Sequence, residues 1–177
     1  MLTNKHEEGV RTWIEVDRAA LKKNYETFRG LIGSKCQLMA VAKSNAYGHG
    51  LVDYAREMEK LGVDWLGVDS IVEGLTLRRE GITKPILVLG YTLPHNYASA
   101  VENKITLTVS SHEGLDQITK HPVRFHLKVD TGMHRQGFLL EQMPEVISCL
   151  QKNDIAPEKF EGIFTHFAAA KNPAFPR

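Results

Sequence analysis

Short apolar segments alternate with amphipathic segments along most of this 177-residue sequence, and no other feature constrains the fold as strongly. The apolar segments, rich in β-branched and aromatic residues, predict strands at 36–43, 64–69, 85–90, 104–110, 123–130 and 160–167. Apolar residues three and four positions apart predict helices between them at 50–62, 70–81, 96–104, 111–120 and 139–153. A strand and a helix repeated about every 20–25 residues predict a parallel sheet with helices outside it.

Two α/β architectures fit this alternation, a doubly wound open sheet and a closed (β/α)8 barrel. A doubly wound sheet usually carries G-x-G-x-x-G after an early strand, and the sequence has no such motif. A barrel keeps its chemistry at the carboxyl ends of its strands, where the unusual residues of this sequence stand: Lys43, Asp69, Gly90, Ser110, Asp130 to Arg135 and His166. We therefore expect a TIM-type (β/α)8 barrel, with about six of its eight β-α units in this chain.

The opening segment RTWIEVD, at 11–17, has a different pattern from the barrel strands. Its residues alternate strictly between two faces, which predicts a half-buried strand rather than one covered on both faces. We expect this strand to pair in a different sheet, and residues 21–33 to form the helix that leads into the first barrel strand. The expected organisation is an opening strand within residues 1–20 and a partial barrel domain over residues 21–177.

Composition excludes several classes of partner. The 22 Lys and Arg residues nearly balance the 21 Asp and Glu residues, whereas nucleic-acid-binding domains usually carry a clear basic excess. The sequence shows neither a membrane-length apolar run nor a signal-peptide h-region, so we expect no membrane contact and a cytoplasmic location. Cys36 and Cys149 are the only cysteines, which fits a reducing compartment. No pair of cysteines or histidines at zinc-ligand spacing has a partner pair elsewhere, so we expect no metal site.

The first candidate for chemistry is Lys43, in the segment AVAKSNAYGHG at 40–50. A lysine at the end of a buried strand either extends its ammonium to solvent or uses its amine, for example to attack an aldehyde. Tyr47 follows four residues later, and Gly48 and Gly50 border the turn. Glycines let backbone N–H groups approach a ligand closely, and a helix beginning near Gly50 would direct its positive end at an anion such as phosphate.

The second candidate segment is KVDTGMHRQG, at 128–137. One interpretation is a solvated turn with an ion pair. Against it, Lys128 lies among residues that we expect to be buried, where an ammonium needs a partner or a modification. Arg135 is suited to binding a carboxylate through two parallel hydrogen bonds. His166, in FTHF at 164–167, ends the sixth predicted strand, although a single histidine is more often a core residue than a catalyst.

Together, the segments AVAKSNAYGHG, HLKVDTGMHRQGF and GIFTHFAAA resemble, in order and spacing, the N-terminal half of the alanine racemases. These are pyridoxal-phosphate-dependent enzymes of fold type III, in which a whole barrel precedes a β-rich second domain. The resemblance covers essentially all of this chain but only about half of a family member. It implies the interconversion of L- and D-alanine, which supplies D-alanine for peptidoglycan, and it implies that this chain is an N-terminal fragment.

The resemblance also implies roles for individual residues. Lys43 corresponds to the lysine that binds pyridoxal 5'-phosphate covalently and acts as one of two catalytic bases. Tyr47 corresponds to a contact of the cofactor phosphate, and Arg135 to the arginine that contacts the cofactor's phenolic oxygen and orients the substrate carboxylate. Lys128 occupies a position that is often carbamylated, which would turn a buried cation into an anion able to hold Arg135.

Three further cofactor contacts follow from the same resemblance. His166 corresponds to a histidine beside the cofactor ring, and Val41 and Leu89 are expected to line the cofactor. Two departures from the family pattern are minor: His134 stands where glycine is commoner, and Ser44 stands where alanine is usual.

The parts of the family site that this sequence lacks are more important. In the family, the second base is a tyrosine of the C-terminal domain, donated across a homodimer. The opening strand would pair with that domain. We therefore expect the 177-residue chain alone to be inactive as a racemase.

Other functions fit part of the pattern. Single-domain pyridoxal-phosphate homeostasis proteins share the barrel and its lysine, but KVDTGMHRQG favours the racemases. Fold type III decarboxylases of basic amino acids are larger and have different phosphate loops. An inactive fragment is the third alternative. The sequence does not distinguish alanine from serine as the substrate.

Overall fold

The computed structural model describes residues 11–172, and the chain forms two compact units that meet between Cys36 and Gln37. Within the described residues, the first unit contains helix α1 (Arg18–Ile32). Asp17 caps this helix, because its carboxylate accepts hydrogen bonds from the N–H groups of Ala19 (2.8 Å) and Ala20 (3.1 Å). Helix α1 spans residue 20, and the two compact units divide after residue 36, while the expected division into an opening strand and a barrel domain stays a prediction.

Residues 11–17 form no regular secondary structure, although the sequence predicts a strand there. A strand forms only where its backbone N–H and C=O groups pair with a neighbour. The one sheet in the described part of the chain does not include this segment. The expected pairing with a second domain stays a prediction.

Six parallel strands form the sheet of the second unit, and neighbours in the sheet are also neighbours in sequence. The strands are β1 (Met39–Val41), β2 (Trp65–Val68), β3 (Ile86–Val88), β4 (Thr106–Val109), β5 (Phe125–Lys128) and β6 (Phe160–Phe164). All six predicted strands are confirmed, each shorter than its predicted segment. The last of them ends at Phe164, so His166 lies in the segment that follows the strand.

Helices connect these strands at the predicted places. They are α3 (Leu51–Leu61), α4 (Ile71–Arg79), α5 (Tyr97–Glu102), α6 (His112–Lys120) and α7 (Met143–Lys152), and a short segment that was not predicted as a helix, α2 (Lys43–Tyr47), precedes α3. Three single 3₁₀ turns, Pro94–Asn96, Leu140–Gln142 and Pro157–Lys159, precede α5, α7 and β6. Local caps bound three of these helices: Ser70 and Ser111 accept hydrogen bonds at the starts of α4 and α6, and Gly62 ends α3 in the left-handed region.

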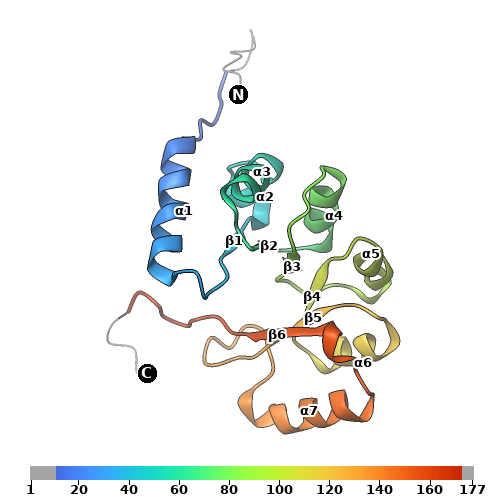
Figure 1. Cartoon of the computed structure of the whole chain (residues 1–177). Coiled ribbons are helices and arrows are strands. Elements are labelled where there is room, and N and C mark those ends of the chain that lie inside the picture. The colour runs from blue at the N-terminus through green and yellow to red at the C-terminus, as the bar shows by residue number, and fades with distance from the viewer. Residues whose placement is uncertain (1–10, 173–177) are drawn as a thin grey trace. The chain divides into compact units, whose positions relative to one another are not determined.

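The strand order distinguishes between the two expected architectures. A doubly wound sheet reverses its strand order, whereas a barrel keeps neighbours in sequence order throughout. Figure 1 shows the six strands following an arc, with α3 to α7 along its outer side. The second unit is therefore a curled half-barrel, and the predicted barrel class is confirmed for the β-α units that the chain contains.

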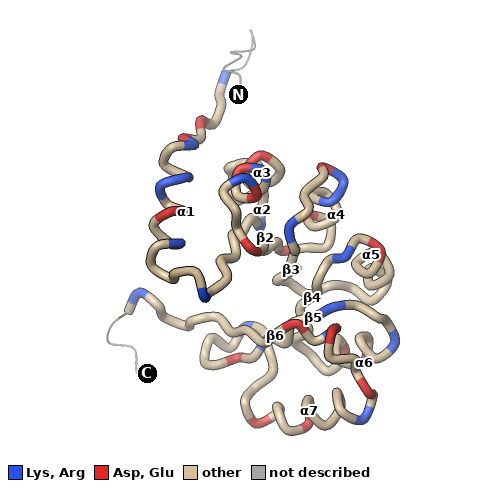
Figure 2. Tube along the Cα trace, viewed as in Figure 1, with Lys and Arg blue, Asp and Glu red and all other residues tan. Residues whose placement is uncertain are grey.

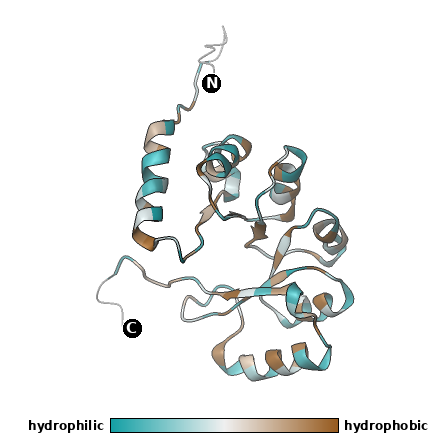
Figure 3. Ribbon diagram, viewed as in Figure 1, coloured by the Kyte–Doolittle hydropathy of each residue, from teal (hydrophilic) through white to brown (hydrophobic). Residues whose placement is uncertain are grey.

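The core lies between the strands and the outer helices. Alternate strand residues are at most 1 % exposed on that side: Leu66, Val68, Ile86, Val88, Leu107, Val109, Phe125 and Leu127. Figure 3 shows hydrophobic strands and helices of mixed hydropathy. Burying such side chains contributes about 1.5–3 kcal/mol each, which explains why the predicted strands form despite their shortness.

The other face of the sheet carries more polar side chains. The rings of Trp65 and His126 meet edge to face, with their centroids 5.5 Å apart, and burial lowers the pKa of His126. Figure 2 shows charges of both signs interspersed over the helices and loops. In the part of the chain that the structure describes, no helix has the length and apolar character needed to span a bilayer.

Candidate functional site

The carboxyl ends of parallel strands lie at one edge of a sheet, and this edge carries the candidate residues. Lys43 lies two residues beyond β1, Arg135 lies in the loop after β5, and His166 lies two residues beyond β6. Because β1 and β6 are the outer strands, Lys43 and His166 belong to opposite sides of the arc. The structure thus gathers the candidates at one edge without bringing every pair into contact.

The segment after Lys43 adopts an unusual backbone. Ser44, Asn45, Ala46 and Tyr47 have φ values between 51° and 56°, so they form one left-handed helical turn. Each non-glycine residue in this region costs roughly 1–2 kcal/mol relative to the right-handed region. A strained run of this kind persists only where surrounding contacts over-determine it. The sequence analysis instead expected Lys43 at the end of a strand and did not anticipate this turn.

Contacts inside the segment hold part of the turn. The Ala46 N–H donates to the Ala42 carbonyl oxygen at 2.8 Å, and the His49 ring lies 2.8 Å from the Ala46 carbonyl oxygen through Nδ1. The Asn45 side-chain oxygen accepts a hydrogen bond from the Leu51 N–H at 2.8 Å, where α3 begins. The turn is thereby joined to the helix that was expected to begin near residue 50.

Glu73, in the first turn of α4, holds the segment from outside. Its Oε1 accepts hydrogen bonds from the N–H groups of Ser44 (2.7 Å) and Asn45 (3.4 Å). Its Oε2 accepts hydrogen bonds from the N–H groups of Asp69 (2.8 Å) and Ser70 (3.3 Å). The sequence analysis did not identify Glu73 as a candidate residue. The available signal was the S-x-x-E spacing of a capping box, which gives no indication of the contact with Ser44.

An apolar surface lies beside the lysine turn. Val41 and Leu89 are half-buried, and both lie on the sheet face that carries Gly67. A Cβ at Gly67 would lie 3.5 Å from Val41 Cγ2 and 3.2 Å from Leu89 Cδ1. These two side chains therefore close over the glycine from neighbouring strands and form a small apolar floor two residues before Lys43.

The loop after β5 is closed by its own backbone. The Phe138 N–H donates to the Lys128 carbonyl oxygen at 2.9 Å, and the Asp130 N–H donates to the Phe138 carbonyl oxygen at 2.8 Å. The Asp130 carboxylate accepts hydrogen bonds from the N–H groups of Gly132 (2.9 Å) and His134 (3.0 Å), and these bonds lower the pKa of Asp130. Backbone donors therefore organise this turn around a buried carboxylate, in place of the solvated ion-pair turn that was the alternative interpretation.

Lys128 is buried, as expected, with 5 % of its surface exposed. Its Nζ lies 5.0 Å from the centre of the Phe164 ring. Burial lowers the pKa of Lys128, the nearby Arg135 charge lowers it further, and Asp130 opposes both effects. Among the described residues, no carboxylate lies within ion-pair distance of Lys128, and the Phe164 ring is the group that its Nζ faces.

Three of the remaining candidates are exposed. Tyr47 is 62 % exposed in the left-handed turn, and Arg135 and His166 project from loops. The loop ends after β5 and β6 are joined by a 2.7 Å hydrogen bond between the hydroxyls of Thr131 and Thr165. Exposed polar side chains above an apolar floor leave this edge accessible to a small anionic ligand.

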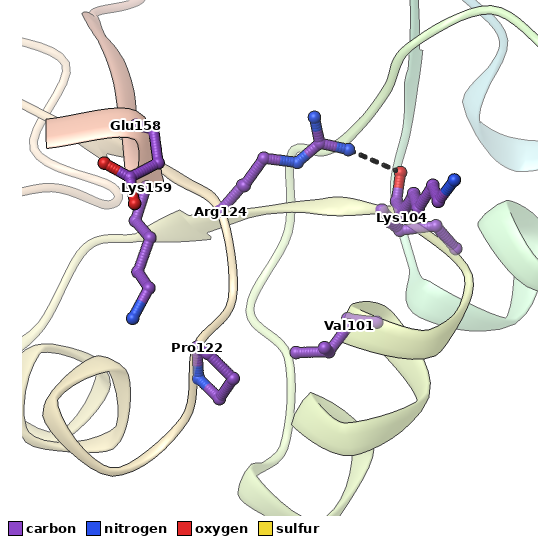
Figure 4. A pocket seen from close by; sticks show the side chains of 8 residues that line it. Val101, Lys104, Pro122, Arg124, Glu158 and Lys159 are labelled. Carbon is purple, nitrogen blue, oxygen red and sulfur yellow. Dashed lines mark hydrogen bonds between the residues drawn. The ribbon is translucent and has the colours of Figure 1, made fainter. Parts of the chain in front are cut away.

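A cavity of about 470 Å³ lies at the opposite end of the strands (Figure 4). Its walls come from segments that immediately precede β4, β5 and β6: Ala100, Val101, Lys104, Ile105, Pro122, Arg124, Glu158 and Lys159. Arg124 there donates a hydrogen bond to the Lys104 carbonyl oxygen at 3.3 Å. The cavity therefore belongs to the amino ends of the strands and not to the candidate site. Over residues 11–172, no group of three or more metal-ligating side chains is placed to hold an ion.

Residues 16–177 match the family described as alanine racemase, N-terminal domain. The chain is 43% identical over 166 residues to an alanine racemase of Methanococcus maripaludis, a match that covers 90% of this chain and 44% of that protein. It is 42% identical over 164 residues to alanine racemase 1 of Bacillus subtilis, covering 90% and 42%. An amino-acid racemase of Enterococcus faecalis is 37% identical over 162 residues, covering 90% and 22%.

Solved structures that this chain resembles are also alanine racemases. The alanine racemase of Clostridium difficile 630 superposes with a TM-score of 0.82 at 38% identity, over 90% of this chain and 43% of that one. The same protein is also known in complex with cycloserine. The chain thus spans less than half the length of the curated relatives and solved structures that it matches.

Proposed function

Because the chain belongs to the alanine racemase N-terminal domain family, we propose that it forms the cofactor-binding part of a pyridoxal-phosphate-dependent racemase that interconverts L- and D-alanine. The observation that carries the proposal is the position of Lys43 at the carboxyl edge of the half-barrel, two residues beyond β1 and immediately before a left-handed turn. The product D-alanine would serve peptidoglycan synthesis.

The residues at this edge fit pyridoxal phosphate chemically. Lys43 offers an amine to the aldehyde, and the half-buried Val41 and Leu89 offer apolar surface to the ring. The exposed Tyr47 hydroxyl offers a hydrogen bond to the phosphate, and the Arg135 guanidinium offers paired donors to an anionic oxygen. His166 would lie beside the ring from the β6 side.

Bound pyridoxal phosphate supplies an electron sink for removal of the substrate α-proton. Lys43 would hold the cofactor covalently through its Nζ amine. The same amine would take or return the substrate α-proton on one face. Arg135 would orient the substrate carboxylate. Racemisation needs a second base on the opposite face, and we propose that residues outside this sequence supply it in a homodimer.

The domain organisation also belongs to the proposal. Residues 1–20 would pair with a C-terminal β-domain, and residues 21–177 would form the barrel part. The 11–17 segment, which forms no regular secondary structure here and ends at the Asp17 cap of α1, would supply the pairing strand. The proposed location is the cytoplasm, and the proposed substrate is alanine or serine.

The first prediction concerns covalent capture of the cofactor by Lys43. The 177-residue chain is incubated with pyridoxal phosphate, reduced with borohydride and mapped by peptide mass spectrometry. We expect one pyridoxyl group on Lys43, because the turn fixes this lysine beside the apolar floor. Lys43→Ala should lose the label, and the exposed-site control Lys120→Ala should keep it. A label on Lys128, or one spread over surface lysines, would contradict the proposal.

The same preparation tests the need for a second base. Exchange of the alanine α-proton and formation of the opposite enantiomer are followed by NMR and chiral chromatography. We expect no racemisation by this chain alone, even when Lys43 is labelled. Turnover by a monomeric 177-residue chain would show that the second base is not supplied from outside it.

The second prediction concerns Lys128, which we propose becomes carbamylated. Its neutral amine would add to carbon dioxide and release one proton, giving an anion that pairs with Arg135. Bicarbonate should therefore add the mass of one carbon dioxide to the Lys128 peptide and raise the melting temperature. Lys128→Met should not respond, whereas the exposed-site control Lys152→Met should respond like the wild type. Added mass on other lysines, without stabilisation, would contradict this role.

Without carbamylation, Lys128→Met should stabilise the fold at neutral pH by about 1 kcal/mol, because it removes a buried charge. The folded-state pKa of Lys128 lies below the unfolded value of 10.5. The unfolded state therefore binds more protons between these two values, and wild-type stability rises with pH across that window. The advantage of Lys128→Met should be full below the folded pKa and fade as pH approaches 10.5. Urea unfolding in carbonate-free buffer measures it, and a variant no more stable than the wild type would show that Phe164 compensates the charge.

A further inference from the structure

We propose that Glu73 is a positioning residue for Lys43, because its carboxylate fixes the left-handed turn 43–47 against the start of α4. The inference rests on the proposed function only in that Lys43 is taken to capture the cofactor. The contact itself stands on the structure. Glu73 contacts backbone groups and not the reacting amine, so its effect on Lys43 is indirect.

The two carboxylate oxygens serve two different segments. Oε1 accepts hydrogen bonds from Ser44 and Asn45, the first two residues after the lysine. Oε2 accepts hydrogen bonds from Asp69 and Ser70, at the end of β2 and the start of α4. One side chain thus joins segments that lie 29 residues apart in sequence, counted from Ser44 to Glu73.

The turn needs an acceptor at this place. In the turn, the Ala46 N–H reaches back to the Ala42 carbonyl oxygen. Ser44 and Asn45 come before Ala46 in the sequence, and their N–H groups donate hydrogen bonds to the Glu73 carboxylate. This is the problem of unsatisfied donors at any helix start, here in a left-handed turn whose conformation is already strained. Loss of the acceptor should release the turn toward the right-handed or extended conformations.

An ordinary capping role for Glu73 does not account for these contacts. In a capping box, Ser70 Oγ accepts from the Glu73 N–H, here at 3.3 Å, and the glutamate reaches back to the Ser70 N–H, also at 3.3 Å. The bond from the Ser44 N–H is shorter, at 2.7 Å. The tighter bond therefore holds the lysine turn, and the looser bonds cap α4.

Two sets of variants separate these roles. Ser70→Ala removes the side-chain cap of α4 and leaves the carboxylate in place. Glu73→Gln keeps one side-chain oxygen, which cannot accept hydrogen bonds from both 44–45 and 69–70. Glu73→Ala keeps no side-chain acceptor. The 177-residue chain of each variant is titrated with pyridoxal phosphate, and the visible absorbance of the bound cofactor gives the dissociation constant. Melting temperatures measure the general loss of stability.

We expect Ser70→Ala and Glu73→Gln to lower the melting temperature similarly, since both weaken the α4 cap. The dissociation constant should rise about tenfold in Glu73→Gln and further in Glu73→Ala, as expected for losing a hydrogen bond to a charged group. Ser70→Ala should stay within about twofold of the wild type. Equal weakening of cofactor binding by Ser70→Ala and Glu73→Gln would overturn the proposal, because it would show that Glu73 acts only by capping α4.

A second measurement needs no cofactor and separates this inference from the proposed function. Amide hydrogen exchange is followed at Ser44 and Asn45 by NMR. Both amides should exchange faster in Glu73→Gln and Glu73→Ala than in the wild type, and Ser70→Ala should leave them unchanged. Unaltered exchange in Glu73→Ala would refute the clamp even if Lys43 captures the cofactor. Failure of the wild type to capture cofactor, with faster exchange in Glu73→Ala, would refute only the proposed function.

Discussion

Gly137→Ala should lower the free energy of unfolding by about 3 kcal/mol or more, the largest effect that we expect of any single methyl group in this chain. Gly137 has φ +123°, outside the range that residues with a Cβ adopt readily. A Cβ there would lie 2.8 Å from Asp130 N and 3.0 Å from the Lys128 carbonyl oxygen. Both are backbone atoms, so no side chain can move aside.

The same substitution should open the loop that carries Arg135. The two backbone hydrogen bonds that close this loop, between Phe138 and Lys128 and between Asp130 and Phe138, flank the crowded site. We expect a melting temperature lower by roughly 6–12 °C for a chain of this length. We also expect weaker cofactor binding, because the loop that carries Arg135 would no longer be closed by its backbone hydrogen bonds.

Gly132→Ala is the matched control for Gly137→Ala. Gly132 has nearly the same φ, +129°, and lies in the same loop, but a Cβ there would meet no atom within 4 Å. It should cost about 1–2 kcal/mol from backbone strain alone. The difference between the two variants in chemical denaturation measures the backbone overlap at Gly137, and equal losses would show that no overlap exists.

Gly90→Ala should be the second most destabilising substitution, at about 2–3 kcal/mol. Gly90 ends the segment after β3, and its N–H donates to the Asp69 carbonyl oxygen at 3.0 Å. A Cβ on Gly90 would overlap that same oxygen. Relief requires the ends of β2 and β3 to separate, which would displace Asp69 from Glu73 and Leu89 from the apolar floor.

Gly114→Ala provides the comparison for Gly90→Ala within the same compact unit. A Cβ at Gly114, in α6, would make ordinary contacts of 3.6–3.8 Å, and alanine favours helix by up to about 1 kcal/mol. Gly114→Ala should therefore be neutral or stabilising in urea denaturation. If Gly90→Ala changed the free energy of unfolding no more than Gly114→Ala does, the close approach of the ends of β2 and β3 would not constrain residue 90.

The order and type of the main elements could be predicted from sequence because they depend on local patterns. Each predicted strand has enough apolar residues to be covered by helices, and each helix has its apolar side at three- and four-residue spacing. The helix starts at Ser70 and Ser111 are also fixed locally, because each serine accepts a hydrogen bond from a backbone N–H three residues later. Strand ends were less predictable, since pairing stops where the backbone turns, and apolar residues such as Phe167 continue beyond that point.

The candidate site was predictable to the level of its motifs. The segments around Lys43, Lys128 and His166 indicated the family, and the family match over residues 16–177 agrees. The burial of Lys128 also followed from its neighbours in sequence. The roles assigned to these residues remain predictions, which the capture, carbamylation and exchange experiments test.

The sequence by itself determined a parallel β-α barrel and the positions of its chemical groups along the chain, because hydrophobic periodicity and motif spacing are local properties. Only the tertiary structure decided the left-handed turn after Lys43, the two-sided contact of Glu73 and the backbone crowding at Gly90 and Gly137. Ser44 and Glu73 are 29 residues apart, and they meet because β1 and β2 are paired. A strained turn is stable only when the fold brings partners into contact with it. The left-handed turn after Lys43 could therefore not be predicted from a local sequence pattern.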